Sequence, residues 1–178
     1  IRLGTSGSLQ EDIPCGTYIA SKYVIGIDGL MYYYKNNNGV LEEELSDSFI
    51  SFMNWADSLP KPYGVKVSDS LFQKIAYDMP TGITVTSPGF YGPQGRNIRL
   101  PLAYPDINDK LPNFKYKNNK ITNYEMETSA LYALGKNLGH ECLTICAIIA
   151  NRKRGEFLET YHKEMENLIE LVLKRLCS

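Results

Sequence analysis

The sequence predicts one α/β domain with a partly parallel sheet. Stretches rich in β-branched and aromatic residues alternate with stretches whose apolar residues recur at helical spacing, which is the pattern of strands joined by helices. A length of 178 residues with 43% hydrophobic content suits one substantial core. Because no repeat, low-complexity tract or linker divides the chain, we expect residues 1–178 to form a single domain.

The first elements are predicted to be strands. Ile1–Gly4 is typical of a strand end, and Gly4–Gly7 of a small-residue turn. Gly16–Ser21 and Tyr23–Ile27 have the β-branched and aromatic composition of strands. Tyr32–Tyr34 is compatible with a strand edge, a lid or a subunit contact.

A turn, a helix, a strand and a long loop follow. Asn36–Gly39 is strongly turn-forming. Ser68 is a capping residue before apolar positions at helical spacing, and that helix should end before Asp78. Ile83–Thr86 alternates as a strand does. Ser87–Arg99 holds three glycines and two prolines and cannot be regular, so we expect a loop at a strand end, where ligand sites occur in α/β sheets.

The C-terminal part alternates in the same way. Apolar residues recur at helical spacing from near Glu127, and Gly139 is a plausible helix C-cap. Leu143–Ala150 is predicted to be a strand buried on both faces. From about Glu156 onward, apolar positions at helical spacing predict a long amphipathic helix that closes the chain.

Composition excludes several classes of function. The net charge of −1 provides no electrostatic footprint for nucleic acid or an acidic membrane. The longest apolar run, Cys142–Ala150, is about half of the roughly 20 residues that a membrane helix needs. The four cysteines lack zinc spacing, and so few in a chain of this size suggest reduced thiols in a cytoplasmic setting. We expect neither a metal nor an organic cofactor.

Three groups of residues are candidates for a ligand site. Arg2 and Thr5–Gly7 outline a phosphate subsite, because a guanidinium and turn N–H groups bind oxyanions, although most such turns are only turns. The two carboxylates of Glu125-Met126-Glu127 suit a ribose diol, but glutamate in a first helical turn also complements the helix dipole in ordinary helices.

The third group lies on the predicted loop. Gln94 offers a paired donor and acceptor, Arg96 offers a fork of donors, and Phe90 could pack against a flat ring. Uracil presents a matching edge of carbonyls that flank an N–H group. The alternative is a loop whose arginine is merely solvated. Neither histidine has an obvious nucleophile partner, which disfavours a Ser-His or Cys-His hydrolase.

Four short motifs in order resemble uridine phosphorylases of the nucleoside phosphorylase superfamily. They are Arg-x-Gly-Thr-x-Gly at Arg2–Gly7, Phe-x-x-x-Gln-x-Arg at Phe90–Arg96, Tyr-Glu-Met-Glu at Tyr124–Glu127 and Ile-x-Asn-Arg at Ile149–Arg152. The resemblance covers nearly the whole chain. It implies a three-layer αβα fold with a central mixed sheet, and a pentosyltransferase that cleaves uridine with inorganic phosphate as co-substrate.

The resemblance also implies a role for individual residues. Phosphate would be held by Arg2 and Thr5, and the departing uracil anion would be stabilised by Gln94 and Arg96; these four carry the implied catalysis. The residues implied to bind the nucleoside are Gly7, Phe90, Gln94, Arg96, Glu125, Met126, Glu127 and Ile149. No side chain would act as a covalent nucleophile, because phosphate itself attacks C1′.

One absence favours uridine over purine nucleosides. Related purine phosphorylases and nucleosidases carry a Ser-Asp pair after the strand that corresponds to Leu143–Ala150, whereas this chain continues with Asn151. The remaining alternatives are a purine nucleoside phosphorylase, a nucleosidase that uses water, and a non-catalytic nucleoside-binding protein.

The chain also departs from the family pattern. The Gly-Asp-Pro loop of the family's phosphate site does not occur in it, and the family's first strands would precede Ile1. We therefore expect a C-terminal portion with an incomplete phosphate site and a sheet with an unpaired edge. By resemblance, the partners would be uridine, phosphate and further copies of the chain, assembled as a hexamer of dimers.

Overall fold

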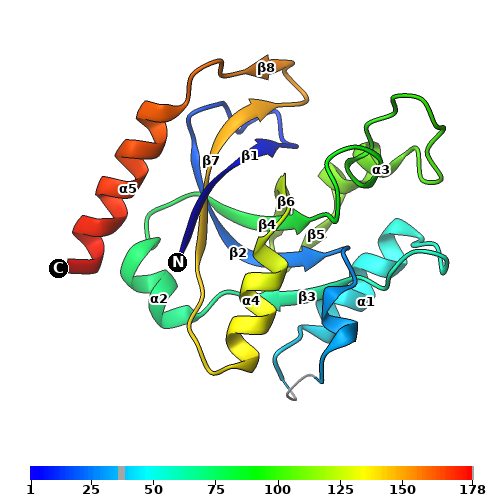
Figure 1. The fold of residues 1–178 in the computed structure, drawn as a ribbon, viewed down its shortest axis with the longest axis horizontal. Coiled ribbons are helices and arrows are strands. Elements are labelled where there is room, and N and C mark those ends of the chain that lie inside the picture. Colours follow the sequence, from blue (N-terminus) through cyan, green and yellow to red (C-terminus); the bar gives the residue numbers. More distant parts are fainter. Residues whose placement is uncertain (36–38, 178) are drawn as a thin grey trace.

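The computed structural model describes residues 1–35 and 39–177, which form a mixed β-sheet with five α-helices around it (Figure 1). The strands are β1 Arg2–Ser8, β2 Tyr18–Gly26, β3 Tyr63–Lys66, β4 Thr81–Thr86, β5 Lys115–Tyr116, β6 Asn119–Glu125, β7 Thr144–Asn151 and β8 Glu156–Phe157. The helices are α1 Glu43–Met53, α2 Asp69–Ile75, α3 Ile107–Lys110, α4 Thr128–Asn137 and α5 His162–Cys177, with short 3₁₀ turns at Leu30–Tyr33, Gly92–Gln94 and Leu111–Asn113.

Five of the strands form a closed circuit. The order along the sheet is β3-β2-β4-β6-β1-β7-β8, and β2 also pairs with β7, which joins β2, β4, β6, β1 and β7 in a ring. The pairs β2–β4, β4–β6 and β1–β7 are parallel, whereas β1–β6 and β2–β7 are antiparallel. The sheet is therefore mixed, as expected.

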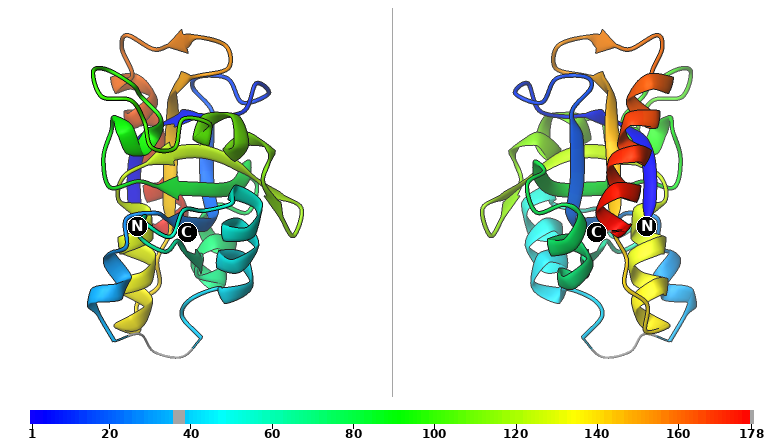
Figure 2. Two further views of the ribbon diagram at one scale, coloured as in Figure 1. Left: turned by 90° about the vertical axis from the view of Figure 1, so that its right-hand side faces the viewer. Right: turned by 90° about the vertical axis from the view of Figure 1, so that its left-hand side faces the viewer.

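Two apolar cores cover opposite faces of the sheet. The first core joins β2 and β7 to α2, α4 and α5, and the second joins β2, β4 and β6 to α1 and α3. Consecutive residues of β2 alternate between them, since Val24 belongs to the first core and Tyr23 and Ile25 to the second. Figure 2 shows α5 and α1 on different sides of the strands. The predicted three-layer α/β arrangement is confirmed.

The predicted turn at Gly4–Gly7 is wrong, because the strand continues through it. β1 pairs in parallel with β7 along its whole length, and the register shifts only between Ser6 and Gly7. Its pairing with β6 is limited to Gly7 and Ser8, so within the described residues the first part of β1 has a strand neighbour on one side only. Long-range pairing has overridden the local preference of glycine for turns.

Other boundaries also differ from the prediction. The two strand-like stretches around Ser21 and Tyr23 form the single strand β2, with a register shift between these residues. The closing helix begins at His162 rather than near Glu156, because Glu156 and Phe157 pair with β7 as β8. Tyr32 and Tyr33 lie in a 3₁₀ turn, so the strand interpretation of this segment is wrong.

The remaining predicted elements are found close to their expected places. α2, β4, α4 and β7 are all present, and Gly139 follows α4 with the positive φ of a C-terminal glycine. Ser68 is the N-cap residue of α2, but its hydroxyl accepts a hydrogen bond from Cys142 N instead of capping the helix. The predicted turn at Asn36–Gly39 lies largely outside the described residues. α1 and β3 were not predicted.

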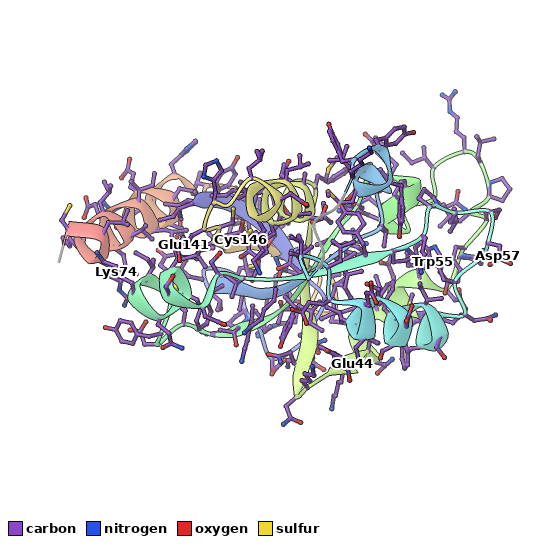
Figure 3. The ribbon with its side chains drawn as sticks, turned by 90° about the horizontal axis from the view of Figure 1, so that it is seen from below. Glu44, Trp55, Asp57, Lys74, Glu141 and Cys146 are labelled. Atoms are coloured by element: carbon purple, nitrogen blue, oxygen red, sulfur yellow. The ribbon has the colours of Figure 1, made fainter. Side chains whose placement is uncertain are left out.

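The described helices are all too short or too polar to cross a bilayer. The four cysteines are free thiols, and Cys146 lies among the strands in the interior of the molecule (Figure 3).

Candidate functional site

A polar cavity of about 270 Å³ is lined by residues along β1, at the carboxyl ends of β6 and β7, and in the loop after β4. Its position follows from the topology, because β1 and β6 pair only through their last residues, Gly7 with Tyr124 and Ser8 with Asn123. All ten residues that the sequence predicted for the site line this cavity. They are Arg2, Thr5, Gly7, Phe90, Gln94, Arg96, Glu125, Met126, Glu127 and Ile149.

Arg2 occupies one end of the cavity and contacts both glutamates. Its Nη1 lies 3.4 Å from Glu125 Oε2 and donates to Cys146 Sγ at 3.4 Å, while Nη2 donates to the carboxylate of Glu127. The guanidinium lies across Gly4, since a Cβ at that position would be 2.9 Å from Arg2 Cζ. Burial lowers the pKa of Arg2, but the neighbouring Cys146 and the two carboxylates outweigh it and raise the pKa overall.

The buried carboxylate of Glu125 caps helix α4. Its Oε2 accepts hydrogen bonds from Glu127 N at 2.9 Å, Thr128 N at 2.8 Å and Thr128 Oγ1 at 2.7 Å. Its Oε1 accepts a hydrogen bond from the Thr86 hydroxyl. The expectation that one carboxylate complements the start of a helix therefore holds for Glu125, which still lines the cavity.

Glu127 has the opposite character. It is the N-cap residue of α4, and its side chain is 58% exposed, compared with 1% for the side chain of Glu125. The one contact that the structure records for its carboxylate is the ion pair with Arg2. The two glutamates are thus divided between holding the helix and presenting an acceptor to the cavity.

The other end of the cavity is built by the loop after β4. Gln94 is 4% exposed; its Nε2 donates to Ser87 Oγ at 2.9 Å and its Oε1 accepts from Arg96 Nη1 at 2.5 Å. The guanidinium of Arg96 lies over the ring of Phe90, 3.6 Å from the centroid, and donates to the Phe90 carbonyl. The alternative of a merely solvated arginine is wrong, because Arg96 is partly buried and bonded within the loop.

Ser6, which lies in the predicted Thr5–Gly7 segment, also lines the cavity, whereas two further lining residues, Tyr124 and Arg152, were not predicted. Arg152 Nη1 donates to Gln94 O at 3.0 Å and Nη2 to Gln94 Oε1 at 3.3 Å, while its guanidinium lies 5.4 Å from the centroid of the Tyr124 ring. Both residues belong to motifs quoted from the sequence, Ile-x-Asn-Arg and Tyr-Glu-Met-Glu, which were the signals that could have identified them.

This end of the cavity is positively charged. Burial, reinforced by the charge of Arg152, lowers the pKa of Arg96 to about 10, and burial also lowers the pKa of Arg152. The Tyr124 hydroxyl is buried without a hydrogen-bond partner, and burial raises the pKa of this phenol. Two guanidiniums, an amide and a free hydroxyl favour a flat ligand that carries carbonyl groups and can accept negative charge.

The side chain of Asn151 is turned away from this chemistry. It is 1% exposed, its Nδ2 donates to Gln10 O at 2.9 Å and Ile13 O at 2.7 Å, and its Oδ1 accepts from Arg154 N. The residue therefore fastens the loop after β1. It supplies no acid to the cavity.

A larger cavity of about 600 Å³ lies on the other side of the same loop. It is lined mainly by apolar residues, including Trp55 (Figure 3), Leu102 and Ile107, and it shares Arg96 with the polar cavity. We place the functional site in the smaller cavity, because that one gathers the charged and hydrogen-bonding groups. Within residues 1–35 and 39–177, no three His, Cys, Asp or Glu side chains form a group that could hold a metal ion.

The chain resembles known proteins over nearly its whole length. Residues 1–176 match the family model described as the phosphorylase superfamily. A uridine phosphorylase from Thermococcus kodakarensis is 27% identical over 170 residues, which covers 92% of this chain and 52% of that protein.

A solved structure shows the same fold. It is a nucleoside phosphorylase from Trypanosoma brucei that is reported to show uridine phosphorylase activity. The two structures superpose with a TM-score of 0.85 at 24% sequence identity, and the match covers 99% of this chain and 62% of the Trypanosoma brucei chain. The chain thus spans about half to three fifths of the length of these two proteins. Since the family model covers nearly every residue, the chain belongs to the phosphorylase superfamily.

Proposed function

We propose that this protein is a uridine phosphorylase, which uses inorganic phosphate to cleave uridine into uracil and ribose 1-phosphate. The observation that carries the proposal is that polar side chains of two kinds share the lining of the 270 Å³ cavity, in two separate hydrogen-bonded groups. Arg2 and Glu127 form one hydrogen-bonded group in its lining, and Gln94, Arg96 and Arg152 form another. Thr5 also lines the cavity. The likeness to the Thermococcus kodakarensis uridine phosphorylase supports the same substrate.

In this proposal each end of the cavity has its own task. Phosphate binds to the Arg2 guanidinium and the Thr5 hydroxyl, in competition with the carboxylate of Glu127 that Arg2 contacts in the free protein. Glu127 is then released toward the ribose hydroxyls, for which a carboxylate is a suitable acceptor. Ribose and phosphate are thereby held next to each other, which favours attack of the phosphate oxygen on C1′.

The base end stabilises the leaving group. As the C1′–N1 bond breaks, its electron pair stays with uracil, and negative charge develops on the ring and its carbonyl oxygens. Arg96 and Arg152 already lie there without a carboxylate partner among the contacts that the structure records, so their charge is free to stabilise the anion. The buried hydroxyl of Tyr124 is a further donor at this end.

The proposal disfavours purine nucleosides. A purine needs an acid at its N7, and the last residue of the corresponding strand β7 is Asn151, whose amide donates to the carbonyls of Gln10 and Ile13. We therefore expect poor turnover of inosine and adenosine.

The test measures uracil release from uridine with and without phosphate, and hypoxanthine release from inosine in parallel. Release of uracil only when phosphate is present supports the proposal. Phosphate-independent release would instead indicate a nucleosidase, and faster turnover of inosine a purine phosphorylase. Binding of uridine without turnover would indicate a non-catalytic nucleoside-binding protein.

A further inference from the structure

Asp28 lies just after β2 and is not among the residues that line the polar cavity. Its carboxylate nevertheless has three hydrogen-bond donors. Oδ1 accepts from Leu30 N at 2.7 Å and from the Tyr63 hydroxyl at 2.8 Å, and Oδ2 accepts from Ser129 Oγ at 2.6 Å. A partly buried carboxylate with this many donors holds its neighbours in one geometry.

Ser129 connects Asp28 to the cavity. It lies in the first turn of α4 and is completely buried, and its N–H group donates to Thr86 Oγ1 at 2.9 Å. The Thr86 hydroxyl in turn donates to Oε1 of Glu125. A continuous chain of hydrogen bonds thus runs from Asp28 through Ser129 and Thr86 to a carboxylate that lines the cavity.

Two of the side chains that donate to Asp28, those of Tyr63 and Ser129, pack closely against β2. A Cβ at Gly26 would lie 2.5 Å from Tyr63 Cζ and 2.8 Å from Ser129 Cβ, so only glycine allows these two side chains to approach β2. The Tyr63 hydroxyl also lies 3.0 Å from Ser129 Oγ, which is a second contact between the two donors of Asp28.

We propose that Asp28 is a positioning residue for the ribose end of the cavity. Through Ser129 it fixes the first turn of α4, and this turn sets both the cap at Glu125 and the direction in which Glu127 leaves the helix. Asp28 touches no substrate in this scheme. The inference rests on the proposed function, because it assigns the ribose hydroxyls of uridine to Glu127.

The most conservative probe is Asp28→Asn. Asparagine keeps the shape and one acceptor oxygen, but its amide N–H₂ group replaces one of the two oxygens that now accept from Leu30, Tyr63 and Ser129. If this occurs at Oδ2, the Ser129 hydroxyl must rotate, and the first turn of α4 loses its anchor. Ser129→Ala removes the same link from the helix side and serves as the second variant if Asp28→Asn does not fold.

The control is Tyr132→Phe. Tyr132 is likewise buried on α4, and its hydroxyl donates to Ser21 O at 2.8 Å and accepts from Thr144 N at 2.9 Å. Its loss should destabilise α4 by a similar amount. Because neither of its partners lies in the chain of bonds to Glu125, it should leave the ribose contacts unchanged.

The measurement is kcat/KM for uridine, 2′-deoxyuridine and 3′-deoxyuridine at saturating phosphate, with Tm recorded for each variant. We expect Asp28→Asn and Ser129→Ala to lower kcat/KM for uridine about two- to tenfold, which is the range for the loss of one hydrogen bond. Both variants should also lower the preference for uridine, meaning the ratio of kcat/KM for uridine to that for at least one deoxy analogue, by a similar factor. Tyr132→Phe should lower Tm and leave this preference unchanged.

The outcomes separate the two proposals. If the unmodified protein releases no uracil in the presence of phosphate, the proposed function fails and this inference fails with it. A second outcome is an active protein whose Asp28 and Ser129 variants have a lower Tm but an unchanged preference for uridine over the deoxy analogues. In that case, or if Tyr132→Phe reduces this preference equally, the network is purely structural and this inference alone is overturned.

Discussion

Glu125 and Glu127 are chemically identical, two positions apart, and offer a matched pair of substitutions. The carboxylate of Glu125 is buried and accepts hydrogen bonds from Thr86, Glu127 and Thr128, whereas the side chain of Glu127 is 58% exposed and contacts Arg2. Glu125→Gln should therefore reduce both stability and uridine turnover. Glu127→Gln should reduce turnover with little effect on stability.

The expected loss at Glu125 can be worked from its contacts. The amide oxygen of Gln can take the place of Oε2 and keep its three donors, but Nε2 then faces the Thr86 hydroxyl and cannot accept from it. One hydrogen bond to a charged acceptor contributes about 1.5–3 kcal/mol. The negative charge at the start of α4 contributes about 0.3–1 kcal/mol more. The sum is about 2–4 kcal/mol.

The assay is calorimetric unfolding of the two variants side by side. For a domain of this length, each kcal/mol shifts Tm by about 2–4 °C, so Glu125→Gln should lower Tm by about 4–16 °C. An exposed substitution such as Glu127→Gln should stay within about 0.5 kcal/mol. Equal Tm values for the two variants would refute the assignment of Glu125 as the cap of α4.

Four further substitutions test other parts of the site. Gln94→Ala and Arg96→Ala should each lower kcat/KM for uridine about 10- to 100-fold, which is the effect of losing a charge-assisted hydrogen bond. An unchanged kcat/KM in steady-state kinetics would contradict the assignment of these residues to the base end. Gly4→Ala should raise KM for phosphate, because the new Cβ displaces the guanidinium of Arg2 that lies 2.9 Å away; an unchanged KM would count against Arg2 as the phosphate ligand. Asn151→Asp should lower Tm, since a carboxylate cannot donate to two buried carbonyls, and should create no activity toward inosine; measurable hypoxanthine release would show that this side chain can reach the cavity.

Elements with a simple period could be predicted from the sequence, whereas elements set by distant partners could not. The alternation in β4 and the helical spacing in α4 are local signals. The glycines of β1 locally favour a turn, and only pairing with β7 keeps this segment extended. α1 carried a usable signal that was missed, because its buried residues Leu45, Phe49 and Met53 follow one another at intervals of four.

The same distinction applies to the site. The resemblance carried by four motifs was sufficient to select ten residues that line one cavity. One motif makes up most of β1, two lie where β6 and β7 end, and one lies in the loop that follows β4. The partners of each side chain were not predictable. A glutamate at the start of the helix was expected, but which of the two accepts from Thr86 and Thr128 depends on the groups that the fold brings within hydrogen-bonding distance. The same is true of the position of Arg96 over Phe90.

The closed circuit of strands has a kinetic consequence. β1 completes the ring by pairing with β7, so that Arg2 lies opposite Thr144. Contacts between segments so far apart in the sequence form late and slowly, because a long loop must be closed before they contribute. The amide hydrogens of β1 and β7 should therefore gain protection from exchange in the same final step of folding. Because residues of β1, β6 and β7 line the cavity, we expect a nucleoside ligand to bind only molecules whose circuit is complete.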